Sequence, residues 1–226
     1  MKNNTPLYKD CEETTLEDIE QNYNGFRGKI STNGRKFLMN DDEKINVIAS
    51  HFKGIMQALG LDLDDDSLKE TPRRVAKMYV KEIFSGLNPA NEPKATLFEN
   101  KYQYNKMIVE KGITLFSYCE HHFVPIIGKV HAAYISKGKV IGLSKINRLV
   151  QYYSKRPQVQ ERLTIDMAEG LKKAIGSDDV AIVIDAVHLC VSSRGVKDTN
   201  SSTITAHYSG KFINEETKSE FLMLIK

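Results

Sequence analysis

The stretch KMIVEKGITLFSYCEHHFVPIIGKVHAAYISKGKVIG, residues 106–142, decides the fold class of this chain. It is rich in β-branched and aromatic residues, and glycine-containing turns such as the one at 136–138 interrupt it. Strands are therefore expected in four runs, at 106–109, 113–117, 123–135 and 139–142. Consecutive short strands joined by tight turns favour an antiparallel meander.

Helical patterns precede this stretch. Apolar residues recur at helical spacing after Asp41 or Asp42, either of which can be the N-cap, and Gly60 is expected to end this helix. A second helix is expected at 71–84, where Pro72 suits the first turn. Residues 41–105 are therefore interpreted as a helical part that comes before the sheet.

Helices and strands also follow the β-rich stretch. The patterns predict helices at 144–153 and 158–175, an apolar strand at 180–191, a strand at 203–208 and an amphipathic segment at 214–225. Gly176 ends the second of these helices. The whole order predicts an α+β fold in which helices lie on one face of an antiparallel sheet.

Composition limits the size and the class of the protein. A chain of 226 residues with 41% hydrophobic content can bury one good core, so residues 41–226 are expected to form a single domain. Residues 1–40 lack periodicity and are interpreted as a loosely ordered arm. The net charge of +3 favours neither a nucleic-acid nor a membrane partner, and the N-terminus has no apolar signal core. A cytoplasmic protein is therefore expected.

Three cysteines are too few, and odd in number, for a disulfide framework. Cys119 begins the cluster Cys119-Glu120-His121-His122, in which a cysteine and a histidine three apart are a usable zinc pair. Cys190 can complete a three-ligand site with one position open to water, as in catalytic zinc sites. The alternative is that Cys190 is an ordinary buried strand residue. Cys11 is most simply a bystander.

Other polar residues suggest a phosphate site and a base site. Lys145, Arg148, Arg194 and Arg74 stand on polar loops or early helical turns, where they can bind phosphate or simply face solvent. Glu161 can stabilise a helix dipole, or it can accept the N1–H and 2-amino hydrogens of a guanine. The Walker pattern is absent, because none of the four Gly-Lys pairs is followed by Ser or Thr.

These segments together resemble GTP cyclohydrolase I from about Asp41 to the C-terminus. The matching motifs are Thr71-Pro72-Arg73-Arg74-Val75, Cys119-Glu120-His121-His122-Phe123, Gly142-Leu143-Ser144-Lys145-Ile146-Asn147-Arg148, Arg156-Pro157-Gln158-Val159-Gln160-Glu161-Arg162-Leu163 and His188-Leu189-Cys190 with Arg194-Gly195-Val196. The resemblance implies a tunnelling fold, in which sheets of several subunits close into a barrel. It also implies a toroidal homodecamer with active sites at subunit junctions.

The resemblance also implies a role for individual residues. The zinc ligands would be Cys119, His122 and Cys190, and the active-site histidines His121 and His188. The guanine would be bound by Gln160 and Glu161, and the ribose triphosphate by Ser144, Lys145, Arg148 and Arg194, with Arg74 coming from a neighbouring subunit.

The implied reaction is the zinc-dependent opening of the guanine imidazole ring of GTP. It releases formate and gives 7,8-dihydroneopterin triphosphate, the first step of tetrahydrofolate and pterin biosynthesis. His188 would protonate N7 while hydroxide supplied by zinc attacks C8, and His121 would assist at the sugar.

The chain departs from the family pattern at Tyr118 and at 191–193, which bears on substrate packing and kinetics, whereas every expected zinc ligand is present. There are two alternatives. One is an inactive relative that binds GTP, and the other is another tunnelling-fold enzyme, such as the nitrile reductase of queuosine synthesis. A zinc nucleobase deaminase is disfavoured because H-x-E with P-C-x-x-C is absent. The sequence leaves open whether a regulatory protein binds.

Overall fold

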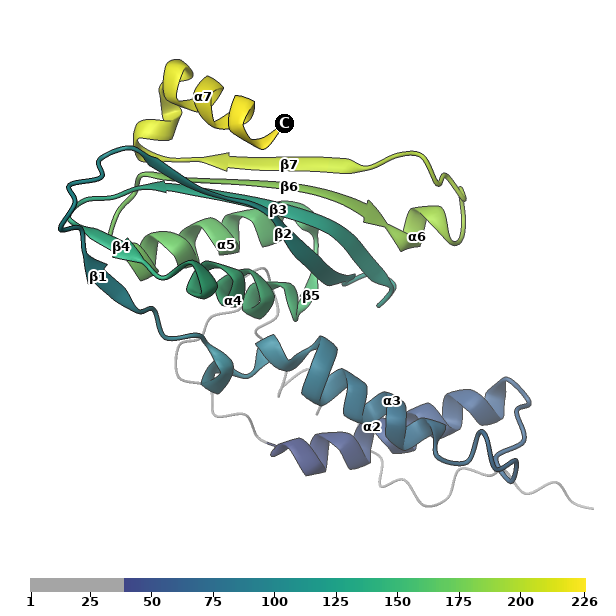
Figure 1. Ribbon diagram of the computed structural model, residues 1–226. Helices are drawn as coiled ribbons and strands as arrows, with labels where there is room; N and C mark the ends of the chain where they lie inside the picture. The colour runs from purple at the N-terminus through teal and green to yellow at the C-terminus, as the bar shows by residue number, and fades with distance from the viewer. Residues whose placement is uncertain (1–38) are drawn as a thin grey trace, which may run out of the picture. The chain divides into compact units, whose positions relative to one another are not determined.

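A five-stranded sheet forms the centre of the fold (Figure 1). The computed structural model describes residues 39–226, so the arm expected at 1–40 and Cys11 lie outside the described residues, except for the last two positions of that arm. The strand order is β5-β2-β3-β6-β7. Four strands pair antiparallel, namely β2 (Met107–Cys119), β3 (Pro125–Ile135), β6 (Val180–His188) and β7 (Thr203–Tyr208), and β5 (Pro157–Gln158) pairs parallel with the end of β2.

The expected meander is only partly correct. The runs at 106–109 and 113–117 are a single strand, β2, whose register shifts between Glu110 and Ile113 because Gly112 adopts a φ of 76°. The run at 139–142 leaves the sheet as β4 (Lys139–Ile141) and pairs with β1 (Leu97–Glu99), a strand that the sequence did not indicate. Gly138, with a φ of 87°, provides the turn that directs β4 away.

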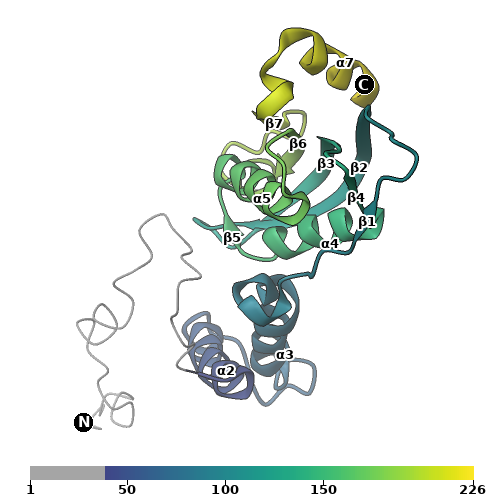
Figure 2. The ribbon, with the colours of Figure 1, turned by 90° about the vertical axis from the view of Figure 1, so that its left-hand side faces the viewer.

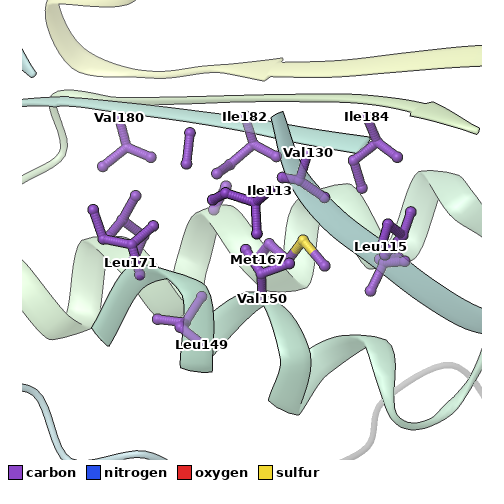
Figure 3. Packing of buried hydrophobic residues seen from close by; sticks show 14 of the residues in the cluster. Ile113, Leu115, Val130, Leu149, Val150, Met167, Leu171, Val180, Ile182 and Ile184 are labelled. Carbon is purple, nitrogen blue, oxygen red and sulfur yellow. The ribbon is translucent and has the colours of Figure 1, made fainter. Parts of the chain in front are cut away.

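Two helices cover one face of the sheet, α4 (Leu143–Ser154) and α5 (Gln160–Ile175) (Figures 1 and 2). The expected glycine stop is confirmed, since Gly176 caps α5 in the left-handed conformation. The core between these helices and the sheet is formed by alternate residues of the strands and the apolar stripes of the helices (Figure 3). Each fully buried Leu, Ile or Val there contributes about 1.5–3 kcal/mol of burial free energy. The members labelled in Figure 3 are Ile113, Leu115, Val130, Leu149, Val150, Met167, Leu171, Val180, Ile182 and Ile184.

The last helix packs on the opposite face, so the expectation of helices on one face is wrong. After a short helix at Gly210–Ile213, α7 (Glu215–Ile225) buries Phe221 against Phe212, with ring centroids 5.8 Å apart. The strand residues beneath them include Ala133 and Val183, which point away from α4 and α5. The central strands β3 and β6 thus carry apolar residues on both faces, which a strand covered by helices on both sides requires.

The N-terminal part contains α2 (Asp41–Ala58) and α3 (Thr71–Met78). The N-cap of α2 is Asn40 rather than Asp41 or Asp42, because Asn40 forms a reciprocal capping box with Glu43. The chain continues from α3 into a π-helical turn, η1 (Tyr79–Ile83), and then into the short 3₁₀ helices η2 (Ser85–Leu87) and η3 (Pro89–Asn91).

Gly86 joins this part to the end of α4. Its N–H donates to the Lys155 carbonyl at 2.9 Å, and its carbonyl accepts from Arg156 Nε at 2.9 Å. Residues 39–226 accordingly form one compact unit. Within them, none of the helices has the length and apolar character needed to cross a bilayer.

Candidate metal centre and active site

The chain makes a tight loop directly after β2. Cys119, the last residue of the strand, is buried, and its carbonyl accepts from the N–H of Phe123 at 2.8 Å and from that of His122 at 3.4 Å. Phe123 has a φ of 53°, which is uncommon for a residue with a side chain. The loop therefore holds His121 and His122 outward beside the cysteine.

Cys190 reaches the same place from a short helix. The strand expected at 180–191 ends three residues early, at His188, and the chain turns into α6 (Leu189–Ser192). The expected end of this strand is therefore wrong, and Cys190 stands on a helix. The candidate metal donors nevertheless meet, because one ligand atom from each of Cys119, His122 and Cys190 lies within 4.8 Å of the others.

This donor set fits a zinc ion. The Cys119 sulfur lies 3.9 Å from Nδ1 of His122, and burial together with the neighbouring Cys119 sulfur raises the pKa of the Cys190 thiol. Two thiols and an imidazole turned toward one another are the soft donors that zinc prefers, and bonds of about 2.0–2.3 Å can be made within such a triangle. Three protein ligands leave one coordination position open.

His188 lies at the end of β6, opposite Ile126 of β3, and its ring is oriented by Gln160. The His188 Nε2 atom is 2.7 Å from Oε1 of Gln160, which is almost completely buried. The Gln160 amide nitrogen donates to the Thr203 carbonyl at 2.7 Å and to the Ile184 carbonyl at 3.3 Å. Burial lowers the pKa of His188, and the charge of Glu161 opposes that shift.

His121 and Arg194 flank the donor set. The Nδ1 atom of His121 lies 3.8 Å from the Cys119 sulfur, and its Nε2 atom lies 3.9 Å from a carboxylate oxygen of Glu120. Arg194 donates through Nη1 to Nε2 of His122 at 3.0 Å. Five of the expected site residues thus form or contact the cluster, namely Cys119, His121, His122, Cys190 and Arg194. His188 stands two residues before Cys190, and Gln160 and Glu161 act on His188.

The remaining expected residues lie elsewhere in the chain. Ser144, Lys145 and Arg148 stand on the first turns of α4, which begins next to β4. The Ile141 N–H donates to the hydroxyl of Tyr134, and Tyr134 pairs with Val180, at the opposite end of β6 from His188. Eight residue steps along a strand span about 26 Å, and Figure 1 shows β4 and α6 at opposite ends of the sheet.

Arg74 is likewise separate from the donor set. It is an exposed residue of α3, and within residues 39–226 no hydrogen bond or ion pair joins Arg74, Ser144, Lys145 or Arg148 to the cluster.

The sequence matches the model of the family described as GTP cyclohydrolase I over residues 48–226. The chain belongs to the GTP cyclohydrolase I family. It is 56% identical over 214 residues to "GTP cyclohydrolase 1" of Flavobacterium johnsoniae, covering 95% of this chain and 96% of that protein. It is 53% identical over 189 residues to "GTP cyclohydrolase 1" of Erwinia tasmaniensis, covering 83% and 86%. The chain is therefore an enzyme of the GTP cyclohydrolase I family.

Among solved structures, the apo form of the archaeosine synthase QueF-Like aligns with a TM-score of 0.38 and 18% identity. The alignment covers 46% of this chain and 92% of that chain, and the likeness is too low to bear on the argument.

Glu120 and Arg162 belong to the GTP cyclohydrolase I motifs but had no expected role. Arg162, on the first turn of α5, donates through Nη2 to Oε2 of Glu120 at 2.5 Å. The residues stand 42 positions apart, so no local pattern could pair them. In the sequence, the only indication that they matter is that each lies in a motif that also contains candidate site residues.

Proposed function

We propose that this enzyme catalyses the hydrolytic opening of the guanine imidazole ring of GTP, with a zinc ion held by Cys119, His122 and Cys190. C8 would leave as formate, and the product would be 7,8-dihydroneopterin triphosphate, the first intermediate of pterin and tetrahydrofolate biosynthesis. The observation that carries the proposal is the meeting of one ligand atom each from Cys119, His122 and Cys190. His188, whose ring is held by buried Gln160, stands two residues before Cys190 in the chain.

Glu161 selects the base. It is exposed on the first turn of α5, next to buried Gln160, and its charge is felt by His188. A carboxylate with two acceptor oxygens can take the N1–H and one 2-amino hydrogen of guanine together, whereas adenine does not offer this pair of donors.

Gln160 determines which nitrogen of His188 carries a proton. Because its amide nitrogen is occupied as a donor to two backbone carbonyls, its oxygen must be the atom that faces His188. His188 therefore donates through Nε2, and Nδ1 is left to face the substrate. When the ring takes up a second proton, that proton is on Nδ1 and is the one given to N7 of guanine. The resemblance implies a guanine-binding role for Gln160, and its buried amide would act on that base through His188.

The metal and the histidines serve different parts of the reaction. Zinc, when bound, supplies Lewis acidity that lowers the pKa of water to about 7, so that hydroxide is available for addition at C8 near neutral pH. Protonation of N7 by His188 makes C8 more electrophilic, which lowers the barrier to that addition. His121, exposed beside Cys119, would move protons at the ribose.

The triphosphate would be bound across subunits. Arg194 stands beside His122, but Ser144, Lys145 and Arg148 lie near the far end of the sheet within one chain. We infer that these residues, and Arg74, act in the site of a neighbouring copy. Such sharing supports a ring of subunits whose sheets close into a barrel, for which we propose the toroidal homodecamer.

The test is incubation of the purified protein with GTP, with measurement of formate and of the fluorescent pterin formed after oxidation. We expect both products from the zinc-loaded protein and neither after chelation. GTP binding without products from the zinc-loaded protein would instead identify an inactive relative.

The metal ligands can be tested separately. Cys190→Ser is expected to lose bound zinc and turnover together, because a serine hydroxyl is a poor zinc ligand. Cys11→Ser, the same substitution outside the family match, is the control and should keep both. Full zinc content in Cys190→Ser would contradict the assigned ligand set.

A further inference from the structure

Glu120 and Arg162 form an ion pair that joins the loop at 119–123, here named the metal loop, to the helix carrying Glu161. Arg162 Nη2 lies 2.5 Å from Oε2 of Glu120, and about a quarter to a third of each side chain is exposed. The backbone reinforces the contact, because the N–H of Glu120 donates to the Gln158 carbonyl at 3.0 Å. The loop that begins at Cys119 is therefore fastened to the segment leading into α5.

Arg162 is itself held in place by other groups. Its Nε atom donates to Oε1 of Gln158 at 2.9 Å, and its Nη2 atom also donates to the Pro157 carbonyl at 3.0 Å. Gln158 is fully buried, and its amide donates to the Tyr153 carbonyl at 3.3 Å. A guanidinium with several fixed acceptors offers its remaining N–H in one direction, and here that direction is toward Glu120.

The second oxygen of Glu120 faces His121. It lies 3.9 Å from Nε2 of His121, whose side chain is 64% exposed and so has little packing to fix its ring. The other polar neighbour is the Cys119 sulfur, 3.8 Å from Nδ1. Of these two polar neighbours, Glu120 is the one whose position is fixed by Arg162.

We propose that Glu120, fixed by Arg162, is a positioning residue that sets the orientation of His121 and keeps the metal loop in register with the first turn of α5. This inference rests on the proposed function. Through this ion pair, the His121 ring, which would act at the ribose, keeps a fixed position relative to Glu161. Glu161 would bind the base of the same nucleoside. A merely structural ion pair would stabilise the fold without affecting the orientation of the ring.

The first experiment is a double-mutant cycle on turnover with Glu120→Gln, Arg162→Met and the double variant. We expect each single variant to lower kcat on the order of tenfold, the range for partners that orient a functional histidine. KM for GTP and zinc content should stay within about twofold, since neither residue is a zinc ligand or a base contact. The double variant should lose no more than either single variant, because both changes interrupt one chain of contacts.

A matched control comes from the same helix. Glu169→Gln removes the same charge from the exposed pair that Glu169 forms with Lys172 at 2.7 Å, and it should leave kcat unchanged. Arg162→Lys keeps the charge but lacks the planar fork, so it should lower kcat as Arg162→Met does. If Arg162→Met does not fold, Glu120→Gln and Arg162→Lys decide the question.

The second readout does not depend on activity. In crystal structures of the zinc-loaded Glu120→Gln and Arg162→Lys variants, the His121 ring should leave the position it has in the unaltered protein or occupy more than one. Either an unmoved ring or an unchanged kcat overturns the inference. If the unaltered protein does not turn over GTP, the proposed function fails, whereas the position of the His121 ring in the variants still decides the inference.

Discussion

Replacement of Gln160 by methionine tests the central assignment of the site. Methionine has nearly the length of glutamine and no polar amide, so it fills the same buried space without the hydrogen bonds. The change removes the acceptor for His188 Nε2 at 2.7 Å and the donor to the Thr203 carbonyl at 2.7 Å. The His188 ring can then rotate, so that Nδ1 no longer points a proton toward N7 of the guanine.

The magnitude follows from the contacts that are lost. A typical hydrogen bond contributes about 1 kcal/mol net to stability. The carbonyl of Thr203, an exposed residue, can bind water in place of the lost amide. The free energy of unfolding should therefore fall by about 2 kcal/mol. The orienting bond to His188 matters more for turnover. Its loss should raise the activation free energy by about 1.4–2.7 kcal/mol. This corresponds to a 10- to 100-fold fall in kcat, because each 1.36 kcal/mol of activation free energy changes the rate about tenfold.

The assay is steady-state formation of the oxidised, fluorescent pterin, accompanied by zinc analysis and by urea unfolding followed by circular dichroism. Zinc content should be unchanged, because Gln160 touches none of the three candidate ligands. Gln151→Met, on the exposed face of α4, is the matched control and should keep both kcat and stability. If Gln160→Met keeps kcat within twofold of the unaltered enzyme, the reasoning about the orientation of His188 is refuted.

Three other predictions test the base site, a close contact and a buried histidine. Glu161→Ala should keep its zinc but bind GTP at least about tenfold more weakly, since hydrogen bonds to a charged group contribute about 1.5–3 kcal/mol; equal affinity would contradict that role. Gly86→Ala should lower the unfolding free energy by about 1–3 kcal/mol, because the added Cβ would lie 2.1 Å from a backbone oxygen of α4. Gly54→Ala, with no atom within 4 Å of the new Cβ, should instead raise it by about 0.5–1 kcal/mol, and thermal unfolding of both variants checks the pair. Burial lowers the pKa of His207 below its ordinary value of 6.5, so His207 stabilises the fold fully above that pH and progressively less as the pH falls below it. The acid-induced fall in melting temperature should be smaller in His207→Gln, and an equally steep fall would show that His207 does not contribute.

The sequence predicts best the elements whose pattern is long or sharply bounded. The strand expected at 203–208 has the observed bounds Thr203–Tyr208, and Gly176 ends α5 as expected. The candidate metal donors were found because cysteine and histidine are rare in this chain, with 3 cysteines and 6 histidines among 226 residues. Their chemistry is visible in the residue types even where the backbone around them was predicted wrongly.

The wrong predictions concern segments that are very short or contacts between residues that lie far apart in the sequence. The four residues Leu189–Ser192 continue the apolar run of β6, and so short a segment cannot distinguish a period of 2 from a period of 3.6. An amphipathic pattern shows that α7 has one buried face but does not show which face of the sheet receives it. The three-residue pairing of β1 with β4, like the pairing of Glu120 with Arg162, depends on contacts between distant segments.

The metal loop explains why the helical part and the sheet part form one compact unit. Phe123 is held at a φ of 53°, which costs free energy for a residue with a Cβ atom, so other contacts must compensate. Its ring packs edge-on against Phe84 at 5.1 Å and against Tyr79 at 6.2 Å, both from the segment that follows α3. Phe84 also contacts Tyr118, the strand residue before Cys119, at 5.7 Å. The helical part therefore stabilises the strained turn that presents the two histidines, and Tyr118 is an aromatic member of that support.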